Sequence, residues 1–154
     1  MTKPMSKFSF TLLALVLFFA HLDALAQVGF GPEARAGLYT QNSDFFLGAG
    51  LRVSVPVVTF VPNAEYVFVD GGTLYTLNLD GQINVLALPL TSLWVGGGWA
   101  RIHSKPDGAD SSTKSGANLY AGFGMNAIVL KPYLQAKYLV NGDDQFVMTL
   151  GLRF

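Results

Sequence analysis

Residues 146–154 read FVMTLGLRF, and apolar residues occupy alternate positions of this segment. Successive side chains of a β-strand point to opposite sides, so the segment would present two different faces as a strand. One face carries Phe146, Met148, Leu150, Leu152 and Phe154, whereas the other carries Val147, Thr149, Gly151 and Arg153. Alternation with a period of two therefore predicts a strand with one apolar face and one mixed face.

The same period of two recurs in seven segments upstream, and together the segments predict eight strands. The seven lie near residues 33–39, 47–55, 63–68, 76–87, 93–102, 118–127 and 133–140. The apolar face of the fourth strand is expected to run from Leu77 to Ala87. In the fifth strand, Trp94 is assigned to the mixed face and Trp99 to the apolar face. Pro62 cannot donate a ladder hydrogen bond, so it is expected to mark one end of the third strand.

The connections between these strands alternate in kind. Short turns that contain proline are expected at residues 56–59, 89–92 and 130–132, and more polar connections at 40–44, 70–73, 103–116 and 141–144. The segment 103–116 is the longest, and its Gly, Asp and Ser content is typical of a solvated loop. An even number of strands would bring both termini to the short-turn end, which is the periplasmic end of membrane barrels. The polar loops would then be extracellular.

Outside the segment 93–102, whose alternation is less decisive, the charged residues within the expected strands all fall on the mixed faces. They are Glu33, Arg35, Arg52, Glu65, Asp80, Lys137 and Arg153. A soluble barrel has the inverse arrangement, because it buries apolar residues and shows polar ones to water. In lipid, only helices or closed barrels pair every backbone polar group, and no segment after Ala26 has the apolar length of a membrane helix. The pattern predicts an all-β, eight-stranded antiparallel up-and-down transmembrane β-barrel.

The seven charges are expected to fill the barrel rather than to line a channel. Four cations and three carboxylates can pair with one another, as buried charges must to offset their desolvation. Side chains fill the lumen of a barrel of eight strands. The sequence therefore predicts a charge network and no large pore.

The N-terminal segment is expected to be a signal peptide. Lys3 and Lys7 precede an apolar run over residues 8–20, and Ala24 and Ala26 supply the small residues of a cleavage site. The run is too short to cross a bilayer core, which needs roughly 20 apolar residues. We expect export through the Sec pathway, with residues 1–26 removed and residues 27–154 forming the barrel.

The composition argues against several other classes of protein. The sequence has no cysteine, so disulfides and thiolate sites are excluded, and its formal net charge is zero without a basic cluster for nucleic acid. No cofactor or metal site is expected. The one histidine after residue 26 and scattered loop acids such as Asp107 and Asp144 lack a ligand spacing.

The residues resemble the small eight-stranded outer-membrane barrels, such as the transmembrane domain of outer membrane protein A and the opacity-type surface proteins. The resemblance rests on the signal peptide, LWVGGGWAR at 93–101, LYAGFGMN at 119–126 and the final FVMTLGLRF. It implies a structural or surface-interaction role in the outer membrane of a Gram-negative cell. It also implies that Leu150, Leu152 and Phe154 are the signal read by the barrel-assembly machinery. Outer-membrane lipid and periplasmic chaperones are then the expected partners, with any extracellular partner open.

Three alternatives remain open at this stage. The first is transport of a small or apolar solute through a narrow barrel. The second is a lipid-modifying enzyme, for which His103 and Ser104 are the candidates, with Asp107 or Asp110 to orient the histidine. Adjacent strand residues point to opposite faces, so a loop would have to realign His103 and Ser104. The third is a soluble lipocalin-like carrier with the faces reversed. We expect no enzyme.

Overall fold

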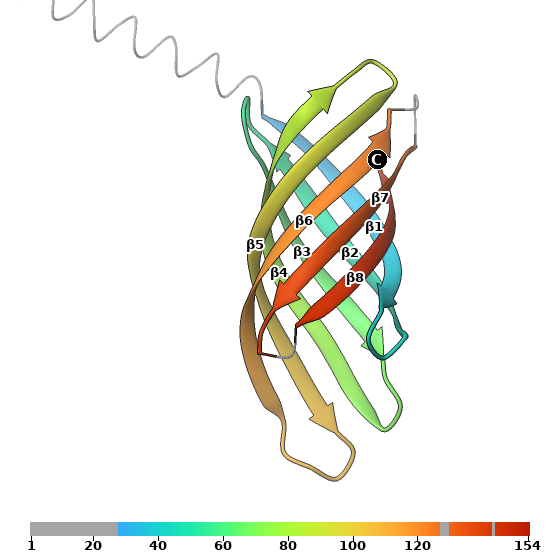
Figure 1. Ribbon diagram of the computed structural model, residues 1–154, viewed down its shortest axis with the longest axis vertical. Helices are drawn as coiled ribbons and strands as arrows, with labels where there is room; N and C mark the ends of the chain where they lie inside the picture. Colours follow the sequence, from blue (N-terminus) through green and yellow to red (C-terminus); the bar gives the residue numbers. More distant parts are fainter. Residues whose placement is uncertain (1–27, 127–129, 143) are drawn as a thin grey trace, which may run out of the picture.

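Eight antiparallel strands, each hydrogen-bonded to the next in sequence, make up the computed structural model, which describes residues 28–126, 130–142 and 144–154 (Figure 1). The strands are β1 (Gly29–Tyr39), β2 (Asp44–Ser54), β3 (Thr59–Phe68), β4 (Gly72–Ala87), β5 (Thr91–Pro106), β6 (Ser112–Met125), β7 (Lys131–Val140) and β8 (Gln145–Arg153). β1 pairs with β8 from Glu33–Arg153 to Tyr39–Val147, which closes the barrel. The predicted fold class is confirmed. The expected signal peptide lies outside the described residues.

The two faces of every strand are assigned as the alternation predicts over most of their length. Among the described residues, 31 large apolar side chains are exposed on the outside, whereas ten apolar side chains are buried. Most buried side chains are polar or charged and point into the lumen. Trp94 is fully buried and Trp99 is exposed, as expected for the fifth strand. The barrel is thus inverted relative to a water-soluble one.

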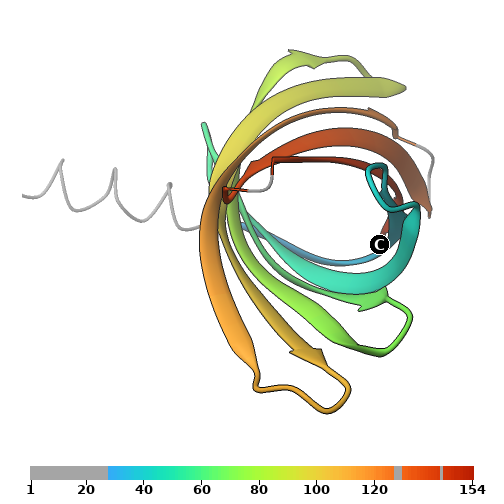
Figure 2. The same cartoon turned by 60° about the horizontal axis from the view of Figure 1, so that its bottom comes forward.

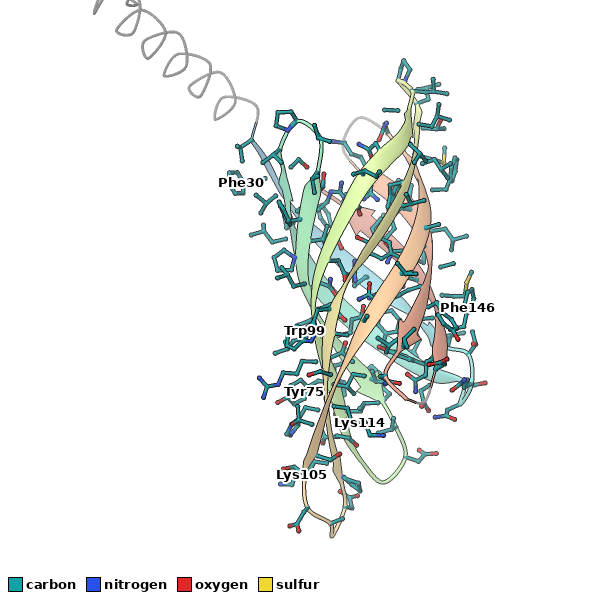
Figure 3. All side chains as sticks on the ribbon, turned by 60° about the vertical axis from the view of Figure 1, so that its left-hand side comes forward. Phe30, Tyr75, Trp99, Lys105, Lys114 and Phe146 are labelled. Atoms are coloured by element: carbon teal, nitrogen blue, oxygen red, sulfur yellow. The ribbon has the colours of Figure 1, made fainter. Side chains whose placement is uncertain are left out.

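Exposed aromatic side chains gather toward both ends of the barrel. Figure 3 shows Phe30 near the short-turn end, and Trp99, Tyr75 and Phe146 toward the opposite end. At that opposite end Phe45 stacks on Phe68, with ring centroids 5.8 Å apart. Leucine, alanine and valine occupy most of the outer face in between. Two aromatic girdles around an aliphatic band are the pattern of barrels that span a bilayer.

The longest predicted loop is wrong, because most of residues 103–116 is strand. β5 continues to Pro106 and β6 begins at Ser112, and the pairs His103–Thr113 and Ser104–Ser112 extend the ladder. The connection itself covers only residues 107–111, with Gly108 at a positive φ of 76°. Figure 2 shows this hairpin extending beyond the closed wall of strands. Polar residues on both faces hid the strand, because alternation appears only where one face is apolar.

Two smaller predictions also need correction. A β-bulge between Asn84 and Leu86 shifts the register, so Ala87 pairs with buried Ser92 and lies on the lumen side instead of the lipid side.

Pro62 does not end its strand, since β3 continues to Thr59. It instead interrupts the β2–β3 ladder, which has no paired residues between Asn63 and Phe60. The missing N–H of proline accounts for this gap.

No helix among the described residues is long and apolar enough to cross a membrane.

Candidate functional site

The seven predicted charges lie inside the barrel. They come from six strands, and Glu33, Arg35, Glu65, Asp80, Lys137 and Arg153 are buried while Arg52 is partly exposed. Alternation places each of them on the inner face of its strand. Closure of the sheet then brings residues far apart in sequence together in the lumen.

Arg35 and Glu65 are at the centre of this network. The Arg35 guanidinium donates to Glu65 Oε1 at 3.0 Å, to Asn63 Oδ1 at 2.8 Å and to Glu33 Oε1. The Tyr39 hydroxyl donates to the second oxygen of Glu65 at 3.0 Å, as does Thr76 at 3.1 Å. Both oxygens of this carboxylate therefore have hydrogen-bonding partners, as a buried ionised group requires.

Lys137 links Glu65 to a second carboxylate. Its Nζ lies 3.4 Å from Glu65 Oε1 and 3.6 Å from Asp80 Oδ2. Asp80 also accepts hydrogen bonds from the side-chain amides of Asn63 at 2.9 Å and Asn118 at 2.8 Å. The asparagines extend the network to neighbouring strands, so that it crosses the lumen.

An apolar layer closes the lumen between the ion pairs and the end of the barrel from which the β5–β6 hairpin extends. Tyr39, Phe46, Val67, Ala100, Leu139 and Val147 form this buried cluster. Phe46 was missed by the sequence analysis, which began the second strand at Leu47. The alternation did indicate it, because Phe46 is two residues before Gly48 and therefore points to the same, inner side of the strand. Its ring fills the space beside Gly37, where a Cβ would lie 2.6 Å from a ring carbon.

An aromatic layer lies on the short-turn side of the network. Trp94 and Tyr133 meet edge to face with centroids 5.8 Å apart, and the Arg153 guanidinium lies 3.8 Å from the Trp94 centroid. Two inward glycines make room for the rings. A Cβ would lie 2.3 Å from the Trp94 ring at Gly122 and 2.2 Å from the Tyr133 ring at Gly151. Bulkier residues therefore do not fit at these positions.

These layers separate a cavity at each mouth of the barrel. The cavity at the short-turn end has a volume of about 280 Å³ and that at the opposite end about 190 Å³. Buried residues of the three layers lie between them. The lumen is filled by side chains rather than open as a channel.

The residues considered for enzyme activity are not brought together. His103 lies on the outer face, with its ring centroid 4.8 Å from that of Tyr75 and its Nδ1 3.0 Å from Thr113 Oγ1. Ser104 points the other way and lines the inner cavity. Asp107 and Asp110 lie in the connection beyond. Within the part of the chain that the structure describes, no group of three or more side chains could hold a metal ion.

The three residues of the predicted assembly signal lie on the outer face of the last strand and just after it. Leu150 is 62% exposed, Phe154 56% and Leu152 38%. Each therefore presents an apolar side chain to the surroundings of the barrel. The inward residues of the same strand, Thr149 and Arg153, are buried.

Comparison with solved structures places the architecture. The N-terminal β-barrel domain of Pseudomonas aeruginosa OprF superimposes with a TM-score of 0.70 at 14% identity, over 81% of this chain and 95% of that chain. The chain has the fold of the eight-stranded outer-membrane barrels. Neisserial surface protein A has a TM-score of 0.60 at 14% identity, over 80% of this chain and 95% of that chain.

A further match is Ail, the attachment invasion locus protein of Yersinia pestis, in a complex with the heparin analogue sucrose octasulfate. Its TM-score is 0.52 at 13% identity, over 82% of this chain and 96% of that chain. No protein-family model and no curated protein matches the sequence. The likeness to these barrels is one of fold.

Proposed function

We propose that the protein is an integral outer-membrane barrel with a structural or surface-interaction role and no open pore. One observation carries this proposal, namely the exposed apolar wall around a buried charge network. In water such a wall would be a very large exposed apolar patch, whereas in lipid it is the favoured surface. The closed sheet leaves no unpaired edge to the hydrocarbon.

The connections at the two ends have similar lengths, so the proposed orientation follows from the polar composition of one set and from the long β5–β6 hairpin at that end. Barrels of this type have short periplasmic turns and longer extracellular loops. The turns after β2 and β4 would then be periplasmic, together with both termini, after export through the Sec pathway. The hairpin of β5 and β6 would project from the cell surface. This hairpin is the proposed surface for any extracellular partner, because its outer part extends past the wall of the barrel.

Orientation can be tested directly, because the sequence has no cysteine. Single cysteines at Gly108, in the β5–β6 connection, and at Pro89, in a short turn, provide a matched pair. A membrane-impermeant maleimide applied to intact cells should label the first variant and not the second until the cells are lysed. Labelling of Pro89→Cys in intact cells would reverse the orientation, and no labelling of either would contradict surface exposure of the hairpin.

Assembly is proposed to depend on the last strand. Leu150, Leu152 and Phe154 present apolar side chains outward, so that they are available to the barrel-assembly machinery before the sheet closes. Periplasmic chaperones are proposed to hold the unfolded chain, since its strands would expose apolar faces to water during transit. Outer-membrane lipid is the proposed final partner of the same faces.

Transport of a small solute is a second candidate, and the two mouth cavities are the observation in its favour. Conductance across planar bilayers tests it. The barrel should give no steady channels, and regular conductance steps would contradict the proposal that side chains fill the lumen.

An enzyme is not proposed, because His103 and Ser104 lie on opposite faces of β5. Mass spectrometry of lipid A from cells with and without the protein should give the same profile.

A further inference from the structure

The cavity at the short-turn mouth has a strongly one-sided charge. Three of its lining residues, Arg52, Lys131 and Arg153, are cations, and none of its lining residues is aspartate or glutamate. Phe154, the last residue, also lines the cavity. Among the described residues its main-chain carboxylate forms no ion pair with these cations. The rest of the network holds two cations, Arg35 and Lys137, and three carboxylates, so this end differs from the centre of the lumen.

The carboxylates of the central network do not neutralise this excess. Glu33 pairs with one of the lining cations, with its Oε2 3.9 Å from the Arg52 guanidinium. The other oxygen of Glu33 already accepts hydrogen bonds from Arg35 and from the Tyr133 hydroxyl. Neither Lys131 nor Arg153 has an ion pair within the described part of the chain.

Arg153 is held in place without a hydrogen-bonding partner for its Nε. Its guanidinium stacks 3.8 Å from the Trp94 centroid and 4.5 Å from that of Tyr133. The residue is only 7% exposed, and its Nε is buried with no partner among the described residues. The Ser92 hydroxyl, which lines the same cavity, is also buried and unpartnered. Buried polar groups normally find a partner, so two such donors in one cavity point to a ligand.

We propose that this cavity binds a phosphoryl group. A guanidinium stacked on rings keeps its in-plane N–H groups for two oxygens of an anion, and phosphate has the matching geometry. Lys131 and Arg52, which line the same cavity, add two positive charges. Ser92, together with Asn84 and Asn126, supplies neutral hydrogen-bonding groups. A volume of about 280 Å³ holds a phosphate or the phosphoglycerol end of a lipid but not a whole lipid.

The phosphoryl group could come from solution or from an anionic phospholipid of the adjacent leaflet. Only the lipid source rests on the proposed membrane location; free phosphate would bind wherever the barrel is folded. The two sources can therefore be separated in one experiment. The barrel is reconstituted in discs of zwitterionic phosphatidylcholine, or in discs that also contain phosphatidylglycerol. Inorganic phosphate is titrated into the first, with sodium chloride at equal ionic strength as the reference.

Nuclear magnetic resonance of the Trp94 indole N–H and the Arg153 Nε–H reports occupancy. Saturable shifts with phosphate, and not with chloride, indicate a soluble ligand; shifts seen only with phosphatidylglycerol indicate a lipid headgroup. Either result supports the site. Lys131→Gln should weaken binding of the phosphoryl group about tenfold, since the loss of one charge-assisted hydrogen bond lowers affinity by roughly that factor. Lys131 is exposed, so this variant should fold normally.

Arg153→Gln should abolish the shift of the Trp94 signal, and Arg101→Gln serves as the control. Arg101 is exposed on the outer face of β5, away from the cavity. The proposal is overturned if neither phosphate nor phosphatidylglycerol shifts the two signals, or if Lys131→Gln binds as tightly as the wild type.

Discussion

Arg35 and Glu65 meet inside the barrel over Gly48 of the strand between them, with 3.0 Å between Nη1 of the arginine and Oε1 of the glutamate. The two side chains come from β1 and β3, which are not adjacent in the sheet. Each is almost completely shielded, with 2% and 1% of its side chain exposed. Their contact therefore depends on the register of β1, β2 and β3 and on both side chains pointing inward.

Removal of either partner should destabilise the barrel strongly. Glu65→Ala leaves Arg35 and Lys137 without their shared carboxylate, and loss of one partner of a buried pair costs about 3–5 kcal/mol. Urea unfolding in detergent micelles measures the effect. Asp70→Ala, in an exposed connection, is the control and should change stability by less than about 0.5 kcal/mol. Equal stability of Glu65→Ala and wild type would mean that the network is not needed.

Arg52→Ala should have a smaller effect than Arg35→Ala in the same assay. Arg52 lies 3.9 Å from Glu33, and 15% of its side chain is exposed, so solvent screens the pair. A cost of about 1 kcal/mol or less is expected. If Arg52→Ala unfolds at a lower urea concentration than Arg35→Ala, the ion pairs are ranked in the wrong order.

The inward glycines give a prediction about packing. Gly122→Ala would place a Cβ 2.3 Å from the Trp94 ring, which Tyr133 and Arg153 hold in place. Overpacking of this kind costs about 1–3 kcal/mol. Gly81→Ala is the matched control, because the nearest atom to its Cβ is 3.9 Å away. Thermal unfolding followed by tryptophan fluorescence should separate the variants, and identical curves would contradict the packing of the aromatic layer.

A charge on the outer face tests the lipid contact. Leu79 is 56% exposed and pairs with Pro62 near the middle of the β3–β4 ladder. Leu79→Arg should cost about 2–4 kcal/mol in a bilayer, whereas Leu88→Arg, in a short turn, should cost about 0–1 kcal/mol. Unfolding from lipid vesicles measures both. A Leu79→Arg barrel as stable as the wild type would mean that this face is not in hydrocarbon.

Deletion of Phe154 should lower the yield of assembled barrel in the outer membrane. Its outward ring is part of the proposed assembly signal, so the effect should be on assembly rather than on stability once folded. Phe123→Ala is the control, because this phenylalanine is exposed to a similar degree on β6. Yields are compared by immunoblot of the membrane fraction. Equal yields for the deletion and the wild type would remove Phe154 from the signal.

The sequence predicts the fold well where one face of a strand is apolar, because alternation then identifies both the strand and its orientation. This holds for β8, with Leu150 out and Arg153 in, and for the glycine-rich β5. It fails in the hairpin at residues 103–116, where both faces are polar and the alternation disappears. Ala87 was misplaced for another reason. A single bulge inverts all later positions of a strand, and nothing in its local composition marks the bulge.

The charge network was partly visible in the sequence. Alternation alone indicates that Arg35, Glu65 and Lys137 point inward, but the contact between Glu65 and Lys137 depends on which strands meet across the closed lumen. Phe46 and the stacking of Arg153 on Trp94 depend on the same three-dimensional arrangement. Spacing along the chain carries no information about contacts between strands on opposite walls.

The inverted barrel is tested most directly by gel mobility of the protein from the outer-membrane fraction, with and without boiling in detergent. A closed barrel in lipid should resist the detergent until heated, so the unboiled sample should migrate differently from the boiled one, at the mass of residues 27–154. Recovery as a soluble periplasmic protein with the same mobility in both samples would contradict the membrane-spanning arrangement.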